Sequence, residues 1–423
     1  MAEPGERVRI EYDQGGAEGV LMPSQSEDSI FVKLDSGYNI GISKSRIKEI
    51  KSLGSVEKKD ILKKNPETKK GLKKIVVLHT GGTIASKVDY STGGVIAKFS
   101  AEDLIGMVPE LDSIANIETE LVANMMSEDM RFSDHQKIAA TIKKHAETGA
   151  DGVIIGHGTD TLGYTAASLA FMFEKINIPV LLVGSQRSSD RPSTDAAMNL
   201  ICAARFIAGT DFKGIAVCMH DSSSDDKCAI LSATKTRKMH TSRRDAFKPV
   251  NDYPIAFIDY KSGKIDAMKD VKNDDKKIAL KDSMEGSVAL IKTHPNMDPA
   301  IFEFLAKQYK GLVLEVTGLG QAPTNLGEDH LKIHKILKDY ISKGGIVGIT
   351  SQCIYGRVHP DIYTNCRRLA DIGCIFCEDM LPETAFVKLA WLLGNHSVEE
   401  AREMLADNLR GVISERTEFD KEF

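Results

Sequence analysis

The chain has 423 residues, of which 42% are hydrophobic and 27% are charged, and this is typical of a globular protein with two or three domains. Lysine and arginine number 55 and aspartate and glutamate 60, a formal net charge of −5, which excludes a globally basic surface for nucleic acid. The first residues lack an apolar signal core and no stretch is long and apolar enough to span a membrane, so we expect a cytoplasmic protein without membrane contact.

The cysteines and histidines indicate neither a disulfide framework nor a metal site. The cysteine count is seven, and an odd number in a long chain does not fit the paired framework of a secreted protein. Cys374 and Cys377 form a C-x-x-C, but no second such pair accompanies them. His157 and His240 neighbour conspicuous motifs without ligand-spaced companions, so we expect buried thiols and no metal.

The amino-terminal part alternates short apolar strands with glycine and serine turns, which predicts a small SH3-like β-barrel over residues 1–50. Residues 51–73 are crowded with lysines, as expected of an exposed basic linker. A lysine run of this kind could bind tRNA phosphates, but such runs are more often solvated surface. Both explanations stay open.

Beyond the linker, apolar β-branched runs alternate with glycine-containing loops and helical stretches, a pattern typical of a parallel sheet with crossover helices. Ser133 and Gln136 are predicted to form a capping box at the start of a helix, and residues 162–174 have helical apolar spacing. We therefore predict a larger, doubly wound α/β domain over residues 74–254. Its expected strands are 75–80, 152–157, 180–185 and 214–219.

The remaining third of the chain repeats this alternation after a charged stretch. Residues 255–286 are predicted to be a connector, followed by a smaller C-terminal α/β domain over residues 287–423. A last core helix is expected from Pro382 to Leu393, with proline in the first turn and Gly394 as the stop signal. The expected strands of this domain are 287–292, 311–318 and 345–351.

Three loops that follow predicted strands carry candidate catalytic side chains. They are T-G-G-T at 80–83, G-H-G-T-D-T at 156–161 and A-T-K-T at 233–236. Ligands of open parallel sheets collect at the carboxyl ends of the strands. Each motif alone has a structural explanation, namely a glycine turn, a helix cap and an exposed lysine. Together they supply a hydroxyl nucleophile, a base and N–H donors for an oxyanion, which amide hydrolysis requires.

These three motifs, in this order, resemble the bacterial-type L-asparaginase family over about residues 74–410. The resemblance implies that Thr83 is the usual nucleophile candidate. It also implies that Thr159, Asp160 and Lys235 form a second hydroxyl–base relay. On this basis replacement of Lys235 by methionine should cost several orders of magnitude in rate, whereas the sequence leaves open which threonine attacks first.

Further positions of the same resemblance concern the substrate. Tyr90 resembles the lid tyrosine that assists the nucleophile. Ser127 and Glu128 resemble the residues that bind the substrate's α-carboxylate and amino group. Backbone N–H groups at Gly82 and Gly158 are expected to face the oxyanion. Glutamine and asparagine both remain possible substrates.

The barrel and basic linker in front of this body resemble the D subunits of archaeal Glu-tRNA(Gln) amidotransferases. The resemblance implies a homodimeric core within a heterotetramer, with tRNA(Gln) bound mostly by a partner E subunit that uses ATP and Mg. This chain itself has no G-x-x-x-x-G-K-[ST] cradle, and no cofactor is expected in it. Two alternatives stay open: a free-standing cytoplasmic L-asparaginase, and a catalytically silent binding protein on the same fold.

Overall fold

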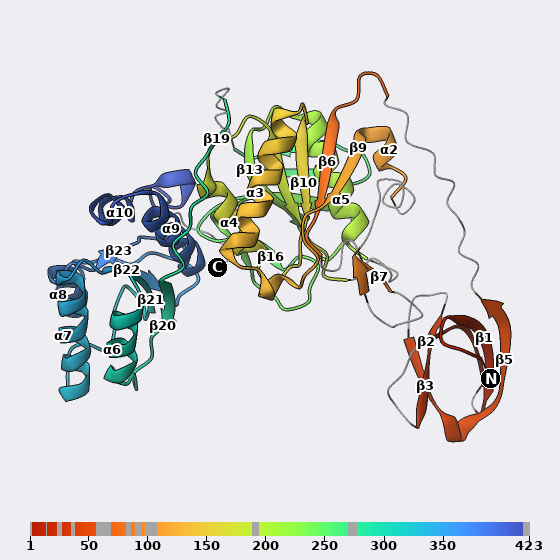
Figure 1. Ribbon diagram of the computed structural model, residues 1–423, viewed down its shortest axis with the longest axis horizontal. Helices are drawn as coiled ribbons and strands as arrows, with labels where there is room; N and C mark the ends of the chain where they lie inside the picture. Colours follow the sequence, from red (N-terminus) through yellow and green to blue (C-terminus); the bar gives the residue numbers. More distant parts are fainter. Residues whose placement is uncertain are drawn as a thin grey trace.

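A computed structural model shows an amino-terminal β unit, a central α/β unit and a smaller carboxyl-terminal α/β unit (Figure 1). Within the described residues no helix is long and apolar enough to cross a membrane. The structure describes residues 2–13, 15–22, 28–34, 39–55, 69–81, 86–88, 95–97, 108–187, 194–269 and 277–417.

The amino-terminal unit is a five-stranded antiparallel sheet in the order β4-β3-β2-β1-β5. In the first two strands every second side chain is buried, and a small separate core forms from Val8, Ile10, Ala17, Leu21, Val32 and Ile42. The last strand was not predicted and runs past residue 50. The strands are β1 (Glu6–Tyr12), β2 (Gly15–Met22), β3 (Ser29–Leu34), β4 (Asn39–Ser43) and β5 (Ile47–Ser55).

The central unit contains an eight-stranded sheet in the order β18-β17-β14-β13-β12-β10-β6-β9. Its parallel strands are β6 (Lys74–His79), β9 (Asn116–Leu121), β10 (Gly152–Gly156), β12 (Pro179–Val183) and β13 (Gly214–His220). Three antiparallel strands complete one side, so the sheet is mixed rather than wholly parallel. They are β14 (Lys227–Ser232), β17 (Ala256–Asp259) and β18 (Ile265–Ala267). The predicted connector 255–286 therefore supplies two strands of this sheet.

Helices cover both faces of this sheet because successive strand residues point to opposite sides. Along β6, Val76 and Leu78 join the core under α3 (Phe132–Glu147) and α4 (Leu162–Met172), whereas Ile75 and Val77 join the core under α5 (Ala196–Gly209). The doubly wound arrangement is confirmed. The predicted capping box is wrong, because α3 begins before Ser133 and the Asp134 carboxylate accepts the Arg131 N–H at 3.1 Å.

The carboxyl-terminal unit is a four-stranded parallel sheet in the order β20-β21-β22-β23. Its strands are β20 (Val288–Lys292), β21 (Gly311–Val316), β22 (Ile346–Ser351) and β23 (Ile375–Phe376). One core cluster joins this sheet to α6 (Pro299–Gln308), α7 (Glu328–Ser342) and α8 (Thr364–Asp371). The helices α9 (Pro382–Asn395) and α10 (Val398–Met404) follow.

The helix α9 joins the two α/β units. Trp391 stacks on Phe171 of α4 with ring centroids 5.8 Å apart, and its indole N–H donates to the Lys281 carbonyl at 2.8 Å. The helix starts at Pro382 as predicted, but it includes Gly394 instead of stopping there. A Cβ on Gly394 would lie 2.6 Å from the Ser283 carbonyl oxygen, so glycine is needed for close packing.

The remaining elements are short. Paired short strands are β7 (Ser86–Val88) with β8 (Val95–Ala97), β11 (Phe173–Lys175) with β19 (Ala279–Leu280), and β15 (Thr236–Lys238) with β16 (Phe247–Pro249). Single-turn helices are η1 (Lys44–Arg46), α2 (Leu111–Ile114), η3 (Ser127–Asp129) and η4 (Leu409–Gly411).

Candidate functional site

The loops after β6, β9 and β10 meet at the carboxyl ends of these parallel strands. The Thr80 hydroxyl donates to the Gly156 carbonyl at 2.9 Å, and the Met125 N–H donates to the Thr80 carbonyl at 3.2 Å. Gly81 has a φ of 100°, and a Cβ on it would lie 2.5 Å from the Met125 carbonyl oxygen. Glycine is therefore required where the first loop crosses the second.

The second and third loops also touch. A Cβ on Gly158 would lie 2.8 Å from the Cβ of Ser127, and the Thr161 hydroxyl donates to the Ser127 carbonyl at 2.6 Å. Ser127 is buried by this contact, while Glu128 in η3 is exposed. The structure thus brings Ser127 and Gly158 together and leaves the Glu128 side chain exposed to solvent, while the substrate-binding roles of these residues stay predictions.

A lysine side chain bridges the hydroxyl of Thr159 and the carboxylate of Asp160 in the loop after β10. Lys238 Nζ lies 2.9 Å from Thr159 Oγ1 and 2.8 Å from Asp160 Oδ1. The Lys238 side chain is only 14% exposed, whereas that of Asp160 is 68% exposed. A hydroxyl and a carboxylate that share one lysine nitrogen form an arrangement that can activate a hydroxyl nucleophile or an attacking water.

This lysine is not the predicted one. Lys235 donates to Asp379 Oδ2 at 2.7 Å, and both side chains are 1% exposed. The predicted contact of Lys235 with Thr159 and Asp160 is therefore wrong. Lys235 lies in the turn before β15 and Lys238 is the last residue of that strand, and the two ammonium-bearing side chains reach different carboxylates, Asp379 and Asp160.

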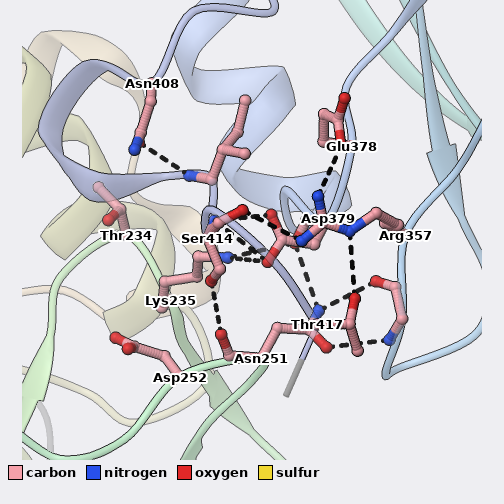
Figure 2. Close-up of polar contacts among 12 residues, drawn as sticks. Thr234, Lys235, Asn251, Asp252, Arg357, Glu378, Asp379, Asn408, Ser414 and Thr417 are labelled. Atoms are coloured by element: carbon pink, nitrogen blue, oxygen red, sulfur yellow. Dashed lines mark hydrogen bonds and ion pairs between the residues drawn. The ribbon is translucent and has the colours of Figure 1, made fainter.

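Lys235 belongs instead to a buried polar cluster between the two α/β units (Figure 2). The Ser414 N–H donates to Asp379 Oδ1 at 3.0 Å, and the Ser414 hydroxyl donates to the Asn251 carbonyl at 2.7 Å. Burial lowers the pKa of Lys235, and the neighbouring Asp379 carboxylate opposes this shift. These contacts connect the turn before β15 to the carboxyl-terminal segment, so we assign the cluster a structural role.

Three predicted site residues, Gly82, Thr83 and Tyr90, lie outside the described residues. Their roles as oxyanion donor, nucleophile and lid residue stay predictions. The described loop ends at Gly81, against Met125 and next to the Gly158 loop.

The thiols take no part in this site. Cys374 and Cys377 are free and buried, as predicted, and burial raises the pKa of each to about 12. Such thiols are poor nucleophiles and poor metal ligands at neutral pH. Among the described residues there is no group of three or more histidine, cysteine, aspartate or glutamate side chains arranged to hold a metal ion.

Comparisons with known proteins identify the family of the chain. Residues 74–272 match the family described as Asparaginase, N-terminal, residues 287–405 match the Glutaminase/Asparaginase C-terminal domain, and residues 2–53 match the GatD N-terminal domain. The chain is 45% identical to the D subunit of a glutamyl-tRNA(Gln) amidotransferase from Pyrococcus furiosus, over 98% of this chain and 96% of the relative. A protein of the same name from Methanococcus maripaludis is 44% identical, over 97% and 98% respectively.

Solved structures place the same fold over most of the chain. The thermostable L-asparaginase from Thermococcus kodakarensis superimposes with a TM-score of 0.72 at 30% identity. The match covers 81% of this chain and 100% of the asparaginase. L-asparaginase I from Vibrio cholerae gives a TM-score of 0.70 at 27% identity, covering 81% and 99%. The predicted asparaginase-like fold is confirmed.

Proposed function

Because the chain belongs to the asparaginase-type family of glutamyl-tRNA(Gln) amidotransferase D subunits, we propose that it frees ammonia from the side-chain amide of glutamine or asparagine for such an enzyme. The observation that carries this proposal is the contact of Lys238 Nζ with both Thr159 Oγ1 and Asp160 Oδ1 at the carboxyl edge of the sheet. Amide hydrolysis is the reaction that this set of groups serves best.

The reaction runs in two halves. A threonine hydroxyl, Thr83 or Thr159, attacks the amide carbon and loses its proton, and the amide nitrogen takes up a proton and leaves as ammonia. Water then hydrolyses the resulting ester and regenerates the hydroxyl. The Lys238 side chain, which contacts Thr159 Oγ1, would accept the proton from Thr159 or from the water, and the Asp160 carboxylate would stabilise the positive charge that forms.

The loop after β9, with Ser127 and Glu128, and the loop after β10, with Gly158 and Thr159, would bind the rest of the substrate. Ser127 lies against Gly158, beside the Thr159 loop, where its hydroxyl could hold the α-carboxylate. The exposed Glu128 would pair with the α-ammonium group. Backbone N–H groups of the Gly82 and Gly158–Thr159 turns would stabilise the oxyanion, and Tyr90 would close over the site.

The ammonia would pass to a partner E subunit, which activates glutamate on tRNA(Gln) with ATP and Mg. This assignment rests on the amino-terminal unit, which matches the GatD N-terminal domain over residues 2–53. We further propose a homodimeric core, a heterotetramer with the partner and a cytoplasmic location. A free-standing L-asparaginase is the second candidate, favoured by the likeness to the Thermococcus kodakarensis enzyme over 81% of this chain.

The test is ammonia release from glutamine and from asparagine by the full chain, alone and with the partner subunit, Glu-tRNA(Gln), ATP and Mg. The proposal expects strong stimulation by the complete mixture and loss of release in the Lys238→Met variant under all conditions. Rapid release by the chain alone, unchanged by the additions, would make it an L-asparaginase. No release in any mixture would overturn the amidohydrolase assignment.

A further inference from the structure

A row of buried polar side chains runs behind the Gly158 loop. His157 follows β10 directly and is fully buried; its Nδ1 lies 2.7 Å from the Gly158 carbonyl oxygen and its Nε2 lies 2.8 Å from Thr165 Oγ1. Thr165 Oγ1 on α4 also lies 3.1 Å from Nε2 of His135 on α3. Nδ1 of His135 lies 2.9 Å from the hydroxyl of Ser168.

The direction of each hydrogen bond in this row follows from valence. Burial holds the pKa of His157 at about 4 and that of His135 at about 3, so both rings are neutral near pH 7 and carry one N–H and one lone pair each. A carbonyl oxygen only accepts, so His157 carries its hydrogen on Nδ1 and its Nε2 accepts from the Thr165 hydroxyl. That hydroxyl has a single hydrogen, so His135 donates to it through Nε2 and accepts from Ser168 through Nδ1.

The hydrogen bond from His157 Nδ1 to the Gly158 carbonyl oxygen fixes the orientation of the Gly158–Thr159 peptide in the candidate site. The Gly158 carbonyl and the Thr159 N–H belong to one planar trans peptide and point in opposite directions. With the carbonyl held on the His157 ring, the N–H points away from it, on a residue that is partly exposed. Among the described residues the Thr159 N–H has no hydrogen-bond partner.

We propose that His157, Thr165 and His135 form a positioning relay that locks the Gly158–Thr159 peptide so that the Thr159 N–H faces the developing oxyanion. This proposal rests on the amidohydrolase function proposed above. A lock is needed because glycine lowers the barrier against a peptide flip, and a flipped peptide would present the Gly158 carbonyl oxygen to the oxyanion. A Cβ on Gly158 would lie 2.8 Å from the Cβ of Ser127, so a larger residue does not fit there and the peptide after this glycine depends on its hydrogen bonds for its orientation.

The first test determines which ring nitrogen of His157 and of His135 carries the hydrogen, and it needs no enzyme assay. In the full-length wild-type chain labelled with ¹⁵N-histidine, imidazole NMR near neutral pH should show His157 with its hydrogen on Nδ1 and His135 with its hydrogen on Nε2. The spectrum of a His157→Asn variant assigns the His157 signals. The Nδ1–H form is the less common tautomer of free histidine, so it is diagnostic here. A hydrogen on Nε2 of His157 would overturn the relay.

The second test removes one hydroxyl from the middle of the relay. Thr165→Val keeps the shape of the side chain but leaves His157 Nε2 without its donor, and we expect kcat to fall by about 10-fold to 100-fold with KM within about twofold, since an aligned oxyanion donor contributes about 10²–10³-fold. Thr165→Ser restores the hydroxyl and should restore kcat to within about twofold. Thr141→Val removes an exposed hydroxyl that bonds the Lys137 carbonyl on α3 and serves as the matched control.

The outcomes separate the relay from the reaction it serves. Wild-type release of ammonia together with an unchanged kcat for Thr165→Val would overturn the relay and leave the amidohydrolase function standing. Should Thr165→Val not fold, Ser168→Ala at the far end of the relay is the second variant; it should lower kcat less than tenfold without raising KM, and a rise in KM alone would count against the relay. If the wild-type chain released no ammonia in any mixture, both proposals would be overturned, whichever tautomers His157 and His135 adopt.

Discussion

Two lysines only three residues apart serve different purposes, and substitution by methionine should separate them. Lys238→Met removes the amine beside Thr159, so we expect kcat/KM for amide hydrolysis to fall by about 10²–10⁴-fold. Its effect on stability should be small, because the Asp160 partner is 68% exposed and exposed ion pairs contribute about 0–1 kcal/mol.

Lys235→Met leaves the Asp379 carboxylate buried without its cation, since both side chains are 1% exposed. We expect the free energy of unfolding to fall by about 3–5 kcal/mol, measured by urea denaturation. The rate of the folded fraction, measured at low temperature, should stay within about tenfold of wild type. A variant with wild-type stability and no activity would return Lys235 to the catalytic role first predicted for it.

Buried histidines make the stability of the chain sensitive to acid. Burial lowers the pKa of His157 from its ordinary 6.5 to about 4. Because the folded pKa lies below the unfolded one, the stabilisation is fully present above about pH 6.5 and is lost as pH falls toward 4, at about 1.4 kcal/mol per unit of pKa shift, or about 3 kcal/mol in all.

His157→Asn takes up no proton, so its urea-unfolding free energy should decline less steeply than that of wild type between about pH 6.5 and pH 4. Gly286→Ala supplies the control, because it changes no ionisable group and should leave the slope unchanged. Parallel pH profiles for wild type and His157→Asn would contradict a neutral, buried His157.

At the residue scale, Thr159 and Asp160 were predicted because the G-H-G-T-D-T motif resembles the asparaginase family and lies shortly after an apolar strand, where a parallel sheet collects its ligands. It did not separate Lys238 from Lys235, since both belong to one short polar stretch. The deciding signal was the partner of Lys235, Asp379, which lies 144 residues away in the chain. A contact between residues so far apart in the chain produces no local sequence pattern that could predict it.

Among the elements, α9 shows how packing overrides a local signal. Gly394 was expected to stop this helix, yet the helix continues to Asn395 because the Ser283 backbone lies directly against the glycine. Seven parallel strands were predicted from their apolar runs, namely β6, β10, β12, β13, β20, β21 and β22. By contrast β5, β9 and β18 were missed, because these edge strands carry many polar side chains and lack such runs, and the inner strands β14 and β17 were missed as well.

Gly394→Ala tests this account of α9. Alanine favours a helix interior over glycine by about 1 kcal/mol, so local propensity alone predicts stabilisation. The new Cβ would lie 2.6 Å from the Ser283 carbonyl oxygen, and we expect a net loss of about 1–3 kcal/mol in the free energy of unfolding. Gly286→Ala is the control: no atom lies within 4 Å of its added Cβ, so its effect should stay within about 0.5 kcal/mol.

At the scale of the whole molecule, the two α/β units share one core. Residues of α4 and α9 belong to a single cluster of buried side chains that also holds one face of the large sheet. The amino-terminal unit has its own small cluster, with Val8 and Ile10 at its centre. Units that share a core unfold together, and a unit with a separate core unfolds on its own.

Calorimetry of the full chain should therefore show two transitions, a small one for the amino-terminal unit and a large one for the two α/β units together. The single tryptophan, Trp391, lies where α9 packs on Phe171, so its fluorescence should follow only the large transition. Deletion of residues 1–68 should remove the small transition and leave the Tm of the large one within about 2 °C, since none of the shared core is lost. Two separate transitions in the truncated chain would mean that α9 does not couple the α/β units.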